Sequence, residues 1–330
     1  MTFTSEQTYA FVMSPRLGDS LLAMVVVNNL VRNDFRVTVF SGQLTALRAW
    51  FPHIDIQPLP VGDAVIPCLN GFDVVLHAFH ADVLVSPAAT ATAAKALHAR
   101  TVVFDDLPVY RQVKNMVDIH MELCERHFGV SEPVRENGMT PPTELRLTMD
   151  ARRVIIHPVA SDQQKSWRPQ RFVKLARALK TQGFEPEFLL PKTALPQWQW
   201  LEAQGFRPTS PGSLDAVAAR IAESGWVIGN DSGIGHLASN LGIPTVSLAM
   251  RRSIAQRWRP GWAPSRAVVA LPLLPSRFLK EKFWKFLLST GRVLRAFHAL
   301  RRECGAPGIV TRTSPGLKAE PVADIRHAGG

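Results

Sequence analysis

Apolar runs of strand length alternate with segments of helical periodicity along the first half of the chain. Residues 9–14 (YAFVMS) and 35–40 (FRVTVF) are rich in aromatic and β-branched residues, and residues 18–31 between them repeat apolar side chains at helical spacing. Further strands are predicted at 54–59, 72–79 and 100–104. The Ala-rich segment 86–99 and residues 110–129, which end at a glycine, predict helices. Because strands that alternate with helices pack as a parallel sheet with crossover helices, this half predicts an α/β domain.

A second series of the same kind follows a segment that has no clear period. Residues 131–152 combine proline, glycine and charged residues, which is typical of a linker between domains. Beyond it the pattern predicts strands at 153–160, 184–191, 226–230 and 244–250, and helices at 168–183, 213–225 and 235–242. We therefore expect two Rossmann-like domains, residues 1–150 and 151–276, whose parallel sheets face a ligand-binding cleft at their carboxyl ends.

Length and composition fit two soluble domains. A chain of 330 residues with 46% apolar residues can bury two cores. The N-terminus has no basic segment before a long apolar stretch, and no window approaches about 18 uninterrupted apolar residues. We therefore expect neither a signal peptide nor a spanning helix, and a cytoplasmic location. The cysteines, Cys68, Cys124 and Cys304, are widely spaced and predict neither disulfides nor a thiolate metal site.

One glycine-rich segment has the pattern of a phosphate-binding turn. Residues 229–242 (GNDSGIGHLASNLG) place glycines around an acid, a serine and a histidine at the start of a predicted helix. The free N–H groups and the positive dipole end of a helix N-terminus favour a phosphate. Ser232, Gly233, Ile234 and Gly235 would offer these amides, and Gly233 would allow close approach to the backbone. An ordinary capped turn between a strand and a helix has the same pattern, so the residues alone leave both interpretations open.

Three stretches, in this order, resemble glycosyltransferase family 9, the heptosyltransferases, which have the GT-B fold. They are SPRLGDSLLA (14–23), IIHPVASDQQKSWRPQRFVKLARAL (155–179) and SLDAVAARIAESGWVIGNDSGIGHLASNLGIPTVSL (213–248). The last contains the Asp-Ser-Gly-x-x-His-Leu-Ala turn, which is the strongest of the three signatures. The resemblance implies transfer of a heptose from a nucleotide donor, usually ADP-heptose, to a hydroxyl of the lipopolysaccharide inner core. It also implies inversion at the anomeric carbon, and neither a metal ion nor a cofactor.

The resemblance assigns donor-binding roles to the loop after the strand predicted at 153–160. Lys165 would offset the negative charge that develops on the departing diphosphate. Trp167 and Pro169 stand where the family has an aromatic residue and a proline, and Ser161 and Ser166 would add hydroxyl contacts. A solvated loop lysine is the plainer interpretation of the residue by itself.

Two further donor-side residues belong to the glycine-rich segment. Asp231 would be repelled by a diphosphate, so we expect it to cap the helix or to bind a hydroxyl of the donor sugar. His236 would donate a hydrogen bond to a phosphate oxygen, more so when protonated. A histidine packed in an apolar helix is the alternative.

The first domain would supply the acceptor side of the reaction. Asp19 would act as general base, because inverting transfer requires a carboxylate near the acceptor hydroxyl. The alternative role for Asp19 is purely structural: an acid at a helix N-terminus interacts favourably with the helix dipole. Gly18 would permit the tight turn, and Arg16 would contact an acceptor phosphate or carboxylate, or else form a surface salt bridge. Arg111 and Lys114, at the start of the helix predicted at 110–129, would face an acidic acceptor or lie on a solvated helix face.

The histidines do not predict a metal site. His77 and His80 in HAFH, and His120 with His127, lack convergent cysteine or carboxylate ligands at a known spacing. Two other functions fit the same fold: a nucleotide-sugar epimerase, which would consume donor without an acceptor, and a nucleotide-sugar-binding protein without catalysis.

Positive charge is concentrated near the C-terminal end. The formal net charge is +11, of which +7 lies between residues 277 and 302 and +4 in residues 1–276. In this basic segment, apolar side chains fall near one helical face; they are Leu279, Phe283, Phe286, Leu287, Leu294 and Phe297. Residues 277–330 would therefore rest on anionic lipid of the inner membrane, or else cross back and pack on the first domain. No motif that reads nucleic acid is present, so we expect no nucleic-acid partner.

Overall fold

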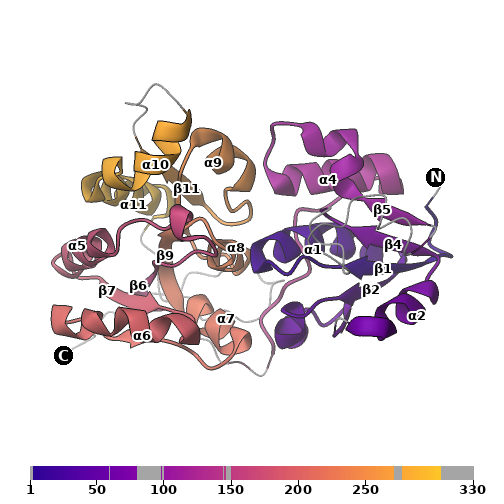
Figure 1. Cartoon of the computed structure of the whole chain (residues 1–330), viewed down its shortest axis with the longest axis horizontal. Helices are drawn as coiled ribbons and strands as arrows, with labels where there is room; N and C mark the ends of the chain where they lie inside the picture. The colour runs from indigo at the N-terminus through magenta and orange to yellow at the C-terminus, as the bar shows by residue number, and fades with distance from the viewer. Residues whose placement is uncertain are drawn as a thin grey trace, which may run out of the picture.

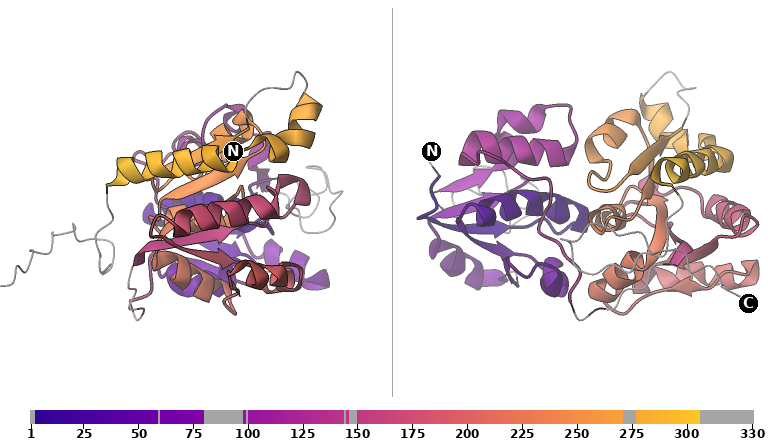
Figure 2. Two further views of the ribbon diagram at one scale, coloured as in Figure 1. Left: turned by 90° about the vertical axis from the view of Figure 1, so that its left-hand side faces the viewer. Right: turned by 180° about the vertical axis from the view of Figure 1, so that it is seen from behind.

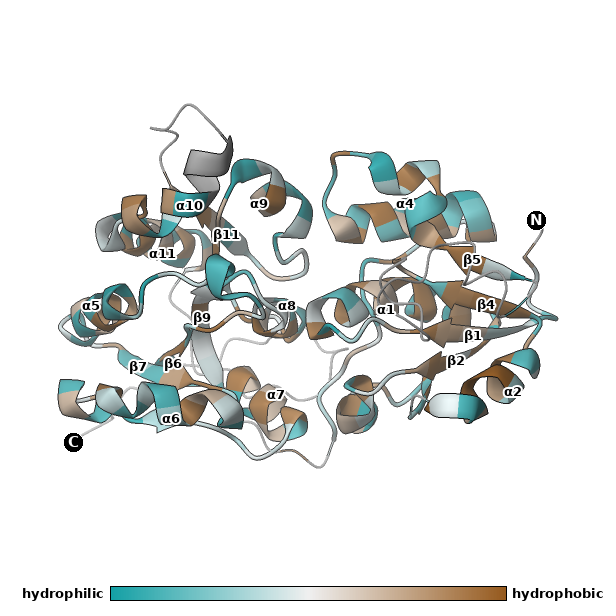
Figure 3. Ribbon diagram, in the orientation of Figure 1, coloured by the Kyte–Doolittle hydropathy of each residue, from teal (hydrophilic) through white to brown (hydrophobic). Residues whose placement is uncertain are grey.

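Two α/β domains stand side by side, each with its own sheet (Figure 1). The structure, a computed structural model, describes residues 3–58, 60–79, 98, 100–143, 145, 150–270 and 277–305, with only the backbone of 277–281. Apart from His98, the helix predicted at 86–99 lies outside the described residues. Hydrophobic residues gather on the strands and on the helix sides that face them (Figure 3).

The first sheet has parallel strands in the order β3-β2-β1-β4-β5. They are β1 (Thr8–Val12), β2 (Arg36–Phe40), β3 (Asp55–Gln57), β4 (Val74–His77) and β5 (Thr101–Val103). The central strand is β1, where Phe11 lies beside Val39 of β2 and Leu76 of β4. The helices are α1 (Leu17–Arg32), α2 (Val65–Asn70) and α4 (Met116–Phe128), with 3₁₀ turns η1 (Leu44–Trp50), η2 (Gly62–Ala64), η4 (Phe104–Asp106) and η5 (Pro108–Arg111). All the strands predicted in this half are confirmed.

The second sheet is also parallel, in the order β11-β10-β9-β6-β7-β8. Its strands are β6 (Asp150–His157), β7 (Glu185–Leu189), β8 (Pro208–Thr209), β9 (Ser224–Asn230), β10 (Thr245–Ala249) and β11 (Ser265–Val269). The helices are α5 (Pro169–Lys180), α6 (Leu195–Trp198), α7 (Leu214–Ala222), α8 (Gly233–Asn240), α9 (Arg252–Trp258), α10 (Arg277–Leu287) and α11 (Thr290–Cys304), with 3₁₀ turns η6 (Gln163–Lys165), η7 (Lys192–Ala194) and η8 (Gln199–Gln204). The four predicted strands are confirmed, whereas the pattern missed β8, β11 and α9.

Helix α1 is buried on almost every side. Every residue from Ser20 to Val27 is buried, and the helix packs against α4 and β2 of its own domain and against α8 of the second domain. A helix that is apolar all round is expected to be enclosed in this way. Because α1 directly follows the central strand, its N-terminus lies at the carboxyl edge of the first sheet and meets the second domain there.

Helix α4 begins later than its sequence predicts. Residues 108–111 form the 3₁₀ turn η5, and the helix starts after Asn115, whose side chain accepts a hydrogen bond from the amide of Val117. The predicted end is confirmed, because Gly129 adopts a left-handed conformation with φ of 71°. Arg111 and Lys114 therefore precede the helix and do not lie in its first turn.

The segment between the two sheets is held tightly against α1 in its described part. Asn29, on α1, donates from Nδ2 to the carbonyl of Val134 over 2.8 Å and accepts from the amide of Val134 over 2.7 Å. Asn137 donates to the carbonyl of Leu21 over 3.0 Å. These hydrogen bonds satisfy the backbone of a segment that has no regular secondary structure of its own.

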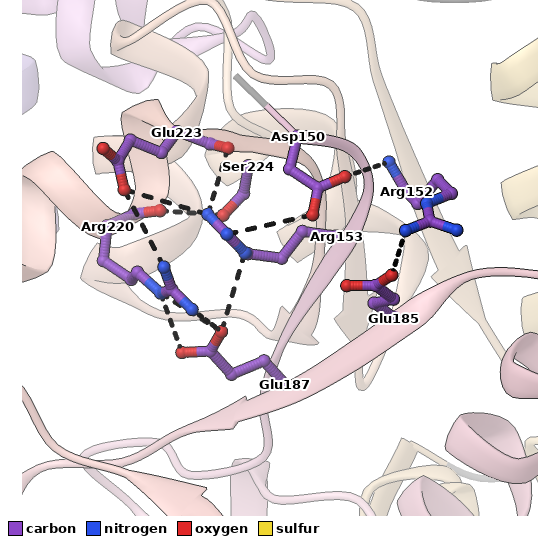
Figure 4. Close-up of polar contacts among 8 residues, drawn as sticks. All are labelled: Asp150, Arg152, Arg153, Glu185, Glu187, Arg220, Glu223 and Ser224. Carbon is purple, nitrogen blue, oxygen red and sulfur yellow. Dashed lines mark hydrogen bonds and ion pairs between the residues drawn. The ribbon is translucent and has the colours of Figure 1, made fainter. Parts of the chain in front are cut away.

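An ion-pair network closes the end of the second sheet that is opposite the cleft (Figure 4). Arg153 of β6, with 17% of its side chain exposed, lies 3.8 Å from carboxylate oxygens of Asp150, Glu187 and Glu223. Arg220 of α7 also binds Glu187, with 2.5 Å between its Nη2 and Oε2. The network joins the strands β6 and β7 to the helix α7, and its charged groups share hydrogen-bond partners.

The basic C-terminal segment forms two helices and not one. Helix α10 ends at Leu287 and α11 starts at Thr290, capped by Ser289. The buried side chains in this segment are Trp284, Leu288, Val293, Phe297 and Leu300, which join the core of the second domain. Phe283 and Phe286, which belong to the predicted apolar face, are 39% and 48% exposed and do not join this core.

Helix α11 packs on the second sheet, where it contacts β10, β11 and α5, as Figure 2 also shows. Residues 290–304 thus do not cross back onto the first domain. The proposed contact with lipid stays a prediction. Within the part of the chain that the structure describes, no helix has both the length and the apolar character needed to span a bilayer.

Candidate active site

Three charged side chains meet where the carboxyl ends of the two sheets face each other. Asp19 lies in the first turn of α1, Asp231 directly follows β9, and Lys165 ends η6 in the loop after β6. The charge of Lys165 lowers the pKa of both carboxyl groups, and the charge of Asp19 raises the pKa of Asp231. The fold therefore brings one lysine from the second domain close to an acid from each domain, as the sequence predicts.

Asp19 is a buried carboxyl group with few partners. Its side chain is 18% exposed, and burial raises its pKa above the usual range of an aspartate. Arg16 at 3.9 Å, Lys165 and a hydrogen bond from Ser14 oppose that rise. Partial burial makes a carboxylate a stronger base, because the charged form loses stabilising hydration and the neutral, protonated form loses much less.

Asp231 is more strongly perturbed. Burial raises its pKa to about 6, the nearby charge of Asp19 adds to the rise, and Lys165 opposes it. The N-cap position of α8 is Ser232, and no side-chain hydrogen bond caps the helix, so the prediction that Asp231 caps α8 is wrong. With a pKa near 6 the carboxyl group is mostly ionised at physiological pH, and a modest further rise in its pKa would protonate it and make it a hydrogen-bond donor.

The loop that carries Lys165 is fixed by a buried asparagine that the sequence did not single out. Asn230, the last residue of β9, donates to the carbonyl of Pro158 over 2.6 Å and accepts from the amide of Trp167 over 2.9 Å. Its two hydrogen bonds hold both ends of the loop. A polar residue that closes an otherwise apolar buried strand is the signal that could have revealed it.

The C-terminal helices hold the same loop from the other side. The indole of Trp284 in α10 donates to the carbonyl of Gln164 over 3.0 Å, directly before Lys165. The indole of Trp167 donates to the carbonyl of Leu288 over 3.0 Å. Trp167, predicted from the family pattern, is therefore a buried anchor of the loop, and the basic segment is structurally part of the second domain.

The N-terminus of α8 faces the cleft with part of its hydrogen-bonding capacity unused. The hydroxyl of Ser232 is buried and has no hydrogen-bond partner among the described residues. The first amides of a helix lack acceptors within that helix, which applies here to Gly233 and Ile234. The amide of Gly235, in contrast, already donates to the carbonyl of Ser232 over 3.1 Å, so its predicted contact with the donor is not supported.

His236 is packed between the domains. It is 4% exposed, and its ring lies edge-on to Trp262 with 6.4 Å between the ring centroids. Burial lowers its pKa to about 4, so the ring is neutral at physiological pH. The prediction that protonation strengthens its contact with a phosphate is therefore not supported, because burial disfavours the charged form.

Two glycines allow α1 and α8 to meet end to end. A Cβ added to Gly233 would lie 2.8 Å from Cβ of Leu17 and 2.9 Å from the amide nitrogen of Gly18. A Cβ added to Gly18 would lie 2.9 Å from Cδ2 of His236. Side chains at these positions would keep the helices apart. The glycines thus bring two positive helix ends, one from each domain, to the same place.

The remaining predicted residues lie around this centre with fewer constraints. Ser161 is exposed, Ser166 is half-buried, and Arg16 is 71% exposed and free to turn toward a ligand. Arg111 is exposed in η5. Lys114 binds Glu122 of its own domain, with 2.7 Å between Nζ and Oε2, which favours the interpretation of a surface ion pair.

Two residues that sequence reasoning missed, one from each domain, also lie at or beside the cleft. The charge of Asp105, in η4 after β5, raises the pKa of Asp19. Its signal was a pair of acids directly after a buried strand. Arg257 of α9 donates to the carbonyls of Tyr110 and Gln112, over 2.7 and 3.1 Å, and so joins the two domains beside η5.

The histidines outside the cleft have structural surroundings. His77 is buried, and burial lowers its pKa to about 4. His120 lies 2.6 Å from the hydroxyl of Tyr110, and its burial lowers its pKa to about 3. His80 lies outside the described residues. The described residues contain no group of three or more His, Cys, Asp or Glu side chains arranged to hold a metal ion.

Solved structures of similar fold include three bacterial glycosyltransferases. The family 9 glycosyltransferase from Veillonella parvula has a TM-score of 0.68 at 16% identity, with 92% of this chain and 99% of that chain covered. Escherichia coli ADP-heptose lps heptosyltransferase II gives 0.64 at 15% identity, with 90% and 99% covered. Escherichia coli heptosyltransferase WaaC with ADP gives 0.65 at 13% identity, with 89% and 100% covered. These likenesses confirm the predicted GT-B fold with two Rossmann-like domains.

Sequence comparison identifies the family. No curated protein sequence matches the chain. The sequence model of "Glycosyltransferase family 9 (heptosyltransferase)" matches residues 76–281, more than half of the 330 residues. That range includes Lys165, the loop held by Asn230, and the glycine-rich turn at the start of α8. The chain belongs to glycosyltransferase family 9 and is a glycosyltransferase of the heptosyltransferase type.

Proposed function

We propose that this enzyme transfers a heptose from ADP-heptose to a hydroxyl of a lipopolysaccharide inner-core acceptor, with inversion and without a metal ion. The second domain binds the donor and the first domain binds the acceptor. Structural relatives support the donor class: WaaC was solved with ADP and with ADP-2-deoxy-2-fluoro heptose. TibC was solved with ADP-D-beta-D-heptose.

One observation carries the proposal: an acid of the first domain faces a lysine and a helix N-terminus of the second. The anomeric carbon of the donor sugar must bond to the acceptor oxygen while its bond to the diphosphate breaks. Asp19 takes the proton of the acceptor hydroxyl, on the side opposite the diphosphate. Lys165 and the amides of Gly233 and Ile234 stabilise the negative charge that passes to the diphosphate oxygen.

These groups provide the positive charge that a metal ion would otherwise supply to the leaving group. The hydroxyl of Ser232 adds a hydrogen bond to the diphosphate, and Asp231 binds a hydroxyl of the donor sugar. Arg16 is placed to contact an anionic group of the acceptor. We infer that the acceptor is presented at the cytoplasmic face of the inner membrane, where anionic lipid favours a basic protein.

The test compares Asp19→Asn with wild type. The change keeps the shape of the side chain and removes the base, so kcat for heptose transfer should fall by about 10²- to 10⁴-fold. Binding of ADP, measured by calorimetry, should be little changed because Asp19 lies on the other domain. Asp63→Asn, an exposed acid of the first domain, is the matched control.

Normal turnover by Asp19→Asn would refute the assignment of the base. Release of ADP from ADP-heptose should depend on the acceptor and should persist in the presence of a chelator. Consumption of the donor without any acceptor would indicate an epimerase instead.

A further inference from the structure

A groove lined by arginines lies on the second domain, away from the cleft. It has a volume of about 690 Å³ and runs along β11 between α9 and α11, the two helices that contact this strand (Figure 1). Five arginines line it: Arg252, Arg259, Arg266, Arg292 and Arg295. Its single acidic lining residue, Glu303, binds Arg266, with 2.8 Å between Oε2 and Nη2.

The charges of the other four arginines in the groove are not neutralised by a carboxylate. Among the residues that the structure describes, none of them forms an ion pair with a carboxylate. Arg292 and Arg295 are three residues apart on α11, a spacing that places them on one face of the helix, where like charges repel. Arg252 is the first residue of α9, and Arg259 directly follows its last residue, Trp258. The fold therefore gathers positive charge in one place at a cost in stability.

The groove is separate from the proposed active site. Arg257 lies on α9 between Arg252 and Arg259 in sequence, but it points to the first domain and binds the carbonyls of Tyr110 and Gln112. Helical geometry places it roughly opposite Arg252 on α9. The helix thus presents one side to the first domain and the other to the groove.

The chemistry of the lining selects a class of ligand. Guanidinium groups bind phosphate in a bidentate manner, and every basic side chain in the lining is an arginine. A phosphoryl group supplies up to two negative charges and three acceptor oxygens. The floor of the groove carries the small side chains Ala255, Ala267 and Ala296, which leave room for a ligand above the strand.

We propose that this groove is a second anion-binding site, which takes a ligand carrying at least two phosphoryl groups. The four arginines that lack carboxylate partners neutralise the ligand from both walls, while Arg266 stays with Glu303. Such a ligand is either a soluble polyphosphorylated molecule or the phosphorylated head group of a lipid. An alternative explanation of the arginines is that charged side chains prevent the open edge of β11 from pairing with another strand. Arg266, which lies on β11 itself, already serves that purpose, so the other four arginines need a different explanation.

The test uses two groove variants and a control of equal charge. Arg252→Gln/Arg295→Gln and Arg259→Gln/Arg292→Gln each remove one arginine from each wall. Arg48→Gln/Arg207→Gln removes two exposed arginines elsewhere. Binding of inorganic tripolyphosphate is measured by calorimetry, and binding to vesicles that contain cardiolipin, whose head group carries two phosphates, by sedimentation, both at low and at physiological salt.

Wild type and control should bind at least one of the two probes, and each groove variant should bind it roughly tenfold more weakly or worse, since hydrogen bonds to charged groups are the strong ones. A loss with tripolyphosphate alone identifies a soluble ligand, and a loss with vesicles identifies a lipid head group. The melting temperature of the groove variants should not fall, because no ion pair is broken. Equal binding by the groove variants and the control, or no binding by wild type, would overturn the proposal.

Discussion

The contact between α1 and α8 can be tested by adding a single methyl group. In Gly18→Ala the new Cβ would lie 2.9 Å from Cδ2 of His236 and 3.3 Å from Cα of Gly233. Carbon atoms in contact prefer about 3.5 to 4.0 Å. The ring of His236 is 4% exposed and lies beside Trp262. We therefore expect the two helix ends to separate by roughly 0.5 to 1 Å to restore that contact distance.

The separation should lower activity more than it lowers donor binding. Overpacking of this kind costs about 1 to 3 kcal/mol, and each 1.4 kcal/mol that is lost only in the transition state is about tenfold in rate. Asp19, the next residue, moves with Gly18, away from Lys165 and Asp231 of the second domain. We expect kcat/KM for heptose transfer to fall about 10- to 100-fold, because a shift of this size is enough to misplace a catalytic group.

Steady-state kinetics and ADP calorimetry on the same preparations provide the measurement. Gly235→Ala is the matched control, because its new Cβ would lie 3.6 Å from Oγ of Ser247, an ordinary contact, within the same helix α8. It should keep its activity and gain stability, since alanine favours a helix by up to about 1 kcal/mol over glycine. Equal activity of the two variants would refute the view that this contact sets the catalytic geometry.

Two other predictions concern stability. Asn230→Ala leaves the amide of Trp167 and the carbonyl of Pro158 without their hydrogen-bond partner. Because an unpaired buried polar group costs about 1 to 3 kcal/mol, the free energy of unfolding, measured in urea, should fall by about 2 to 4 kcal/mol. Burial raises the pKa of Asp231 to about 6, so its contribution to stability is present below about pH 4 and is lost as the pH rises through 6. Asp231→Asn should therefore gain stability over wild type between pH 4 and pH 7, by on the order of 2 kcal/mol in urea unfolding; an unchanged difference would contradict the raised pKa.

The positions of most strands along the chain were predicted from the sequence, because each of these strands is a short apolar run between turn residues. Both sheets follow from that alternation. The edge strand β11 was missed although it begins an apolar run, residues 267–274. Helix α9 has no buried residue and carries Arg252 and Arg257, so no apolar period marks it. In the basic segment the pattern did not single out Val293 and Leu300, which are buried on α11 after the break before Thr290.

The charged centre of the site was predicted because the family pattern names its members. What holds them in place was not, since those contacts join distant parts of the chain. Asn230 is 72 residues from Pro158, and Trp284 is 120 residues from Gln164. Neither pair shares a local motif. The sequence also could not show which groups at the start of α8 lack a hydrogen-bond partner. Only the structure shows that the amide of Gly235 already has an acceptor, whereas the hydroxyl of Ser232 has no partner among the described residues.

The charges of the cleft fit the proposed function, in which the site binds a diphosphate and also removes a proton. Lys165 and two helix N-termini supply positive potential, and Asp19 and Asp231 oppose it. A diphosphate next to Asp231 would raise its pKa beyond about 6, because like charges disfavour ionisation. Asp231 would then be protonated and would donate a hydrogen bond, which removes the repulsion that its carboxylate would cause. Asp19, held on the other domain behind Gly18, would keep its negative charge. The division of the two acids between two domains thus lets one be neutral while the other acts as a base.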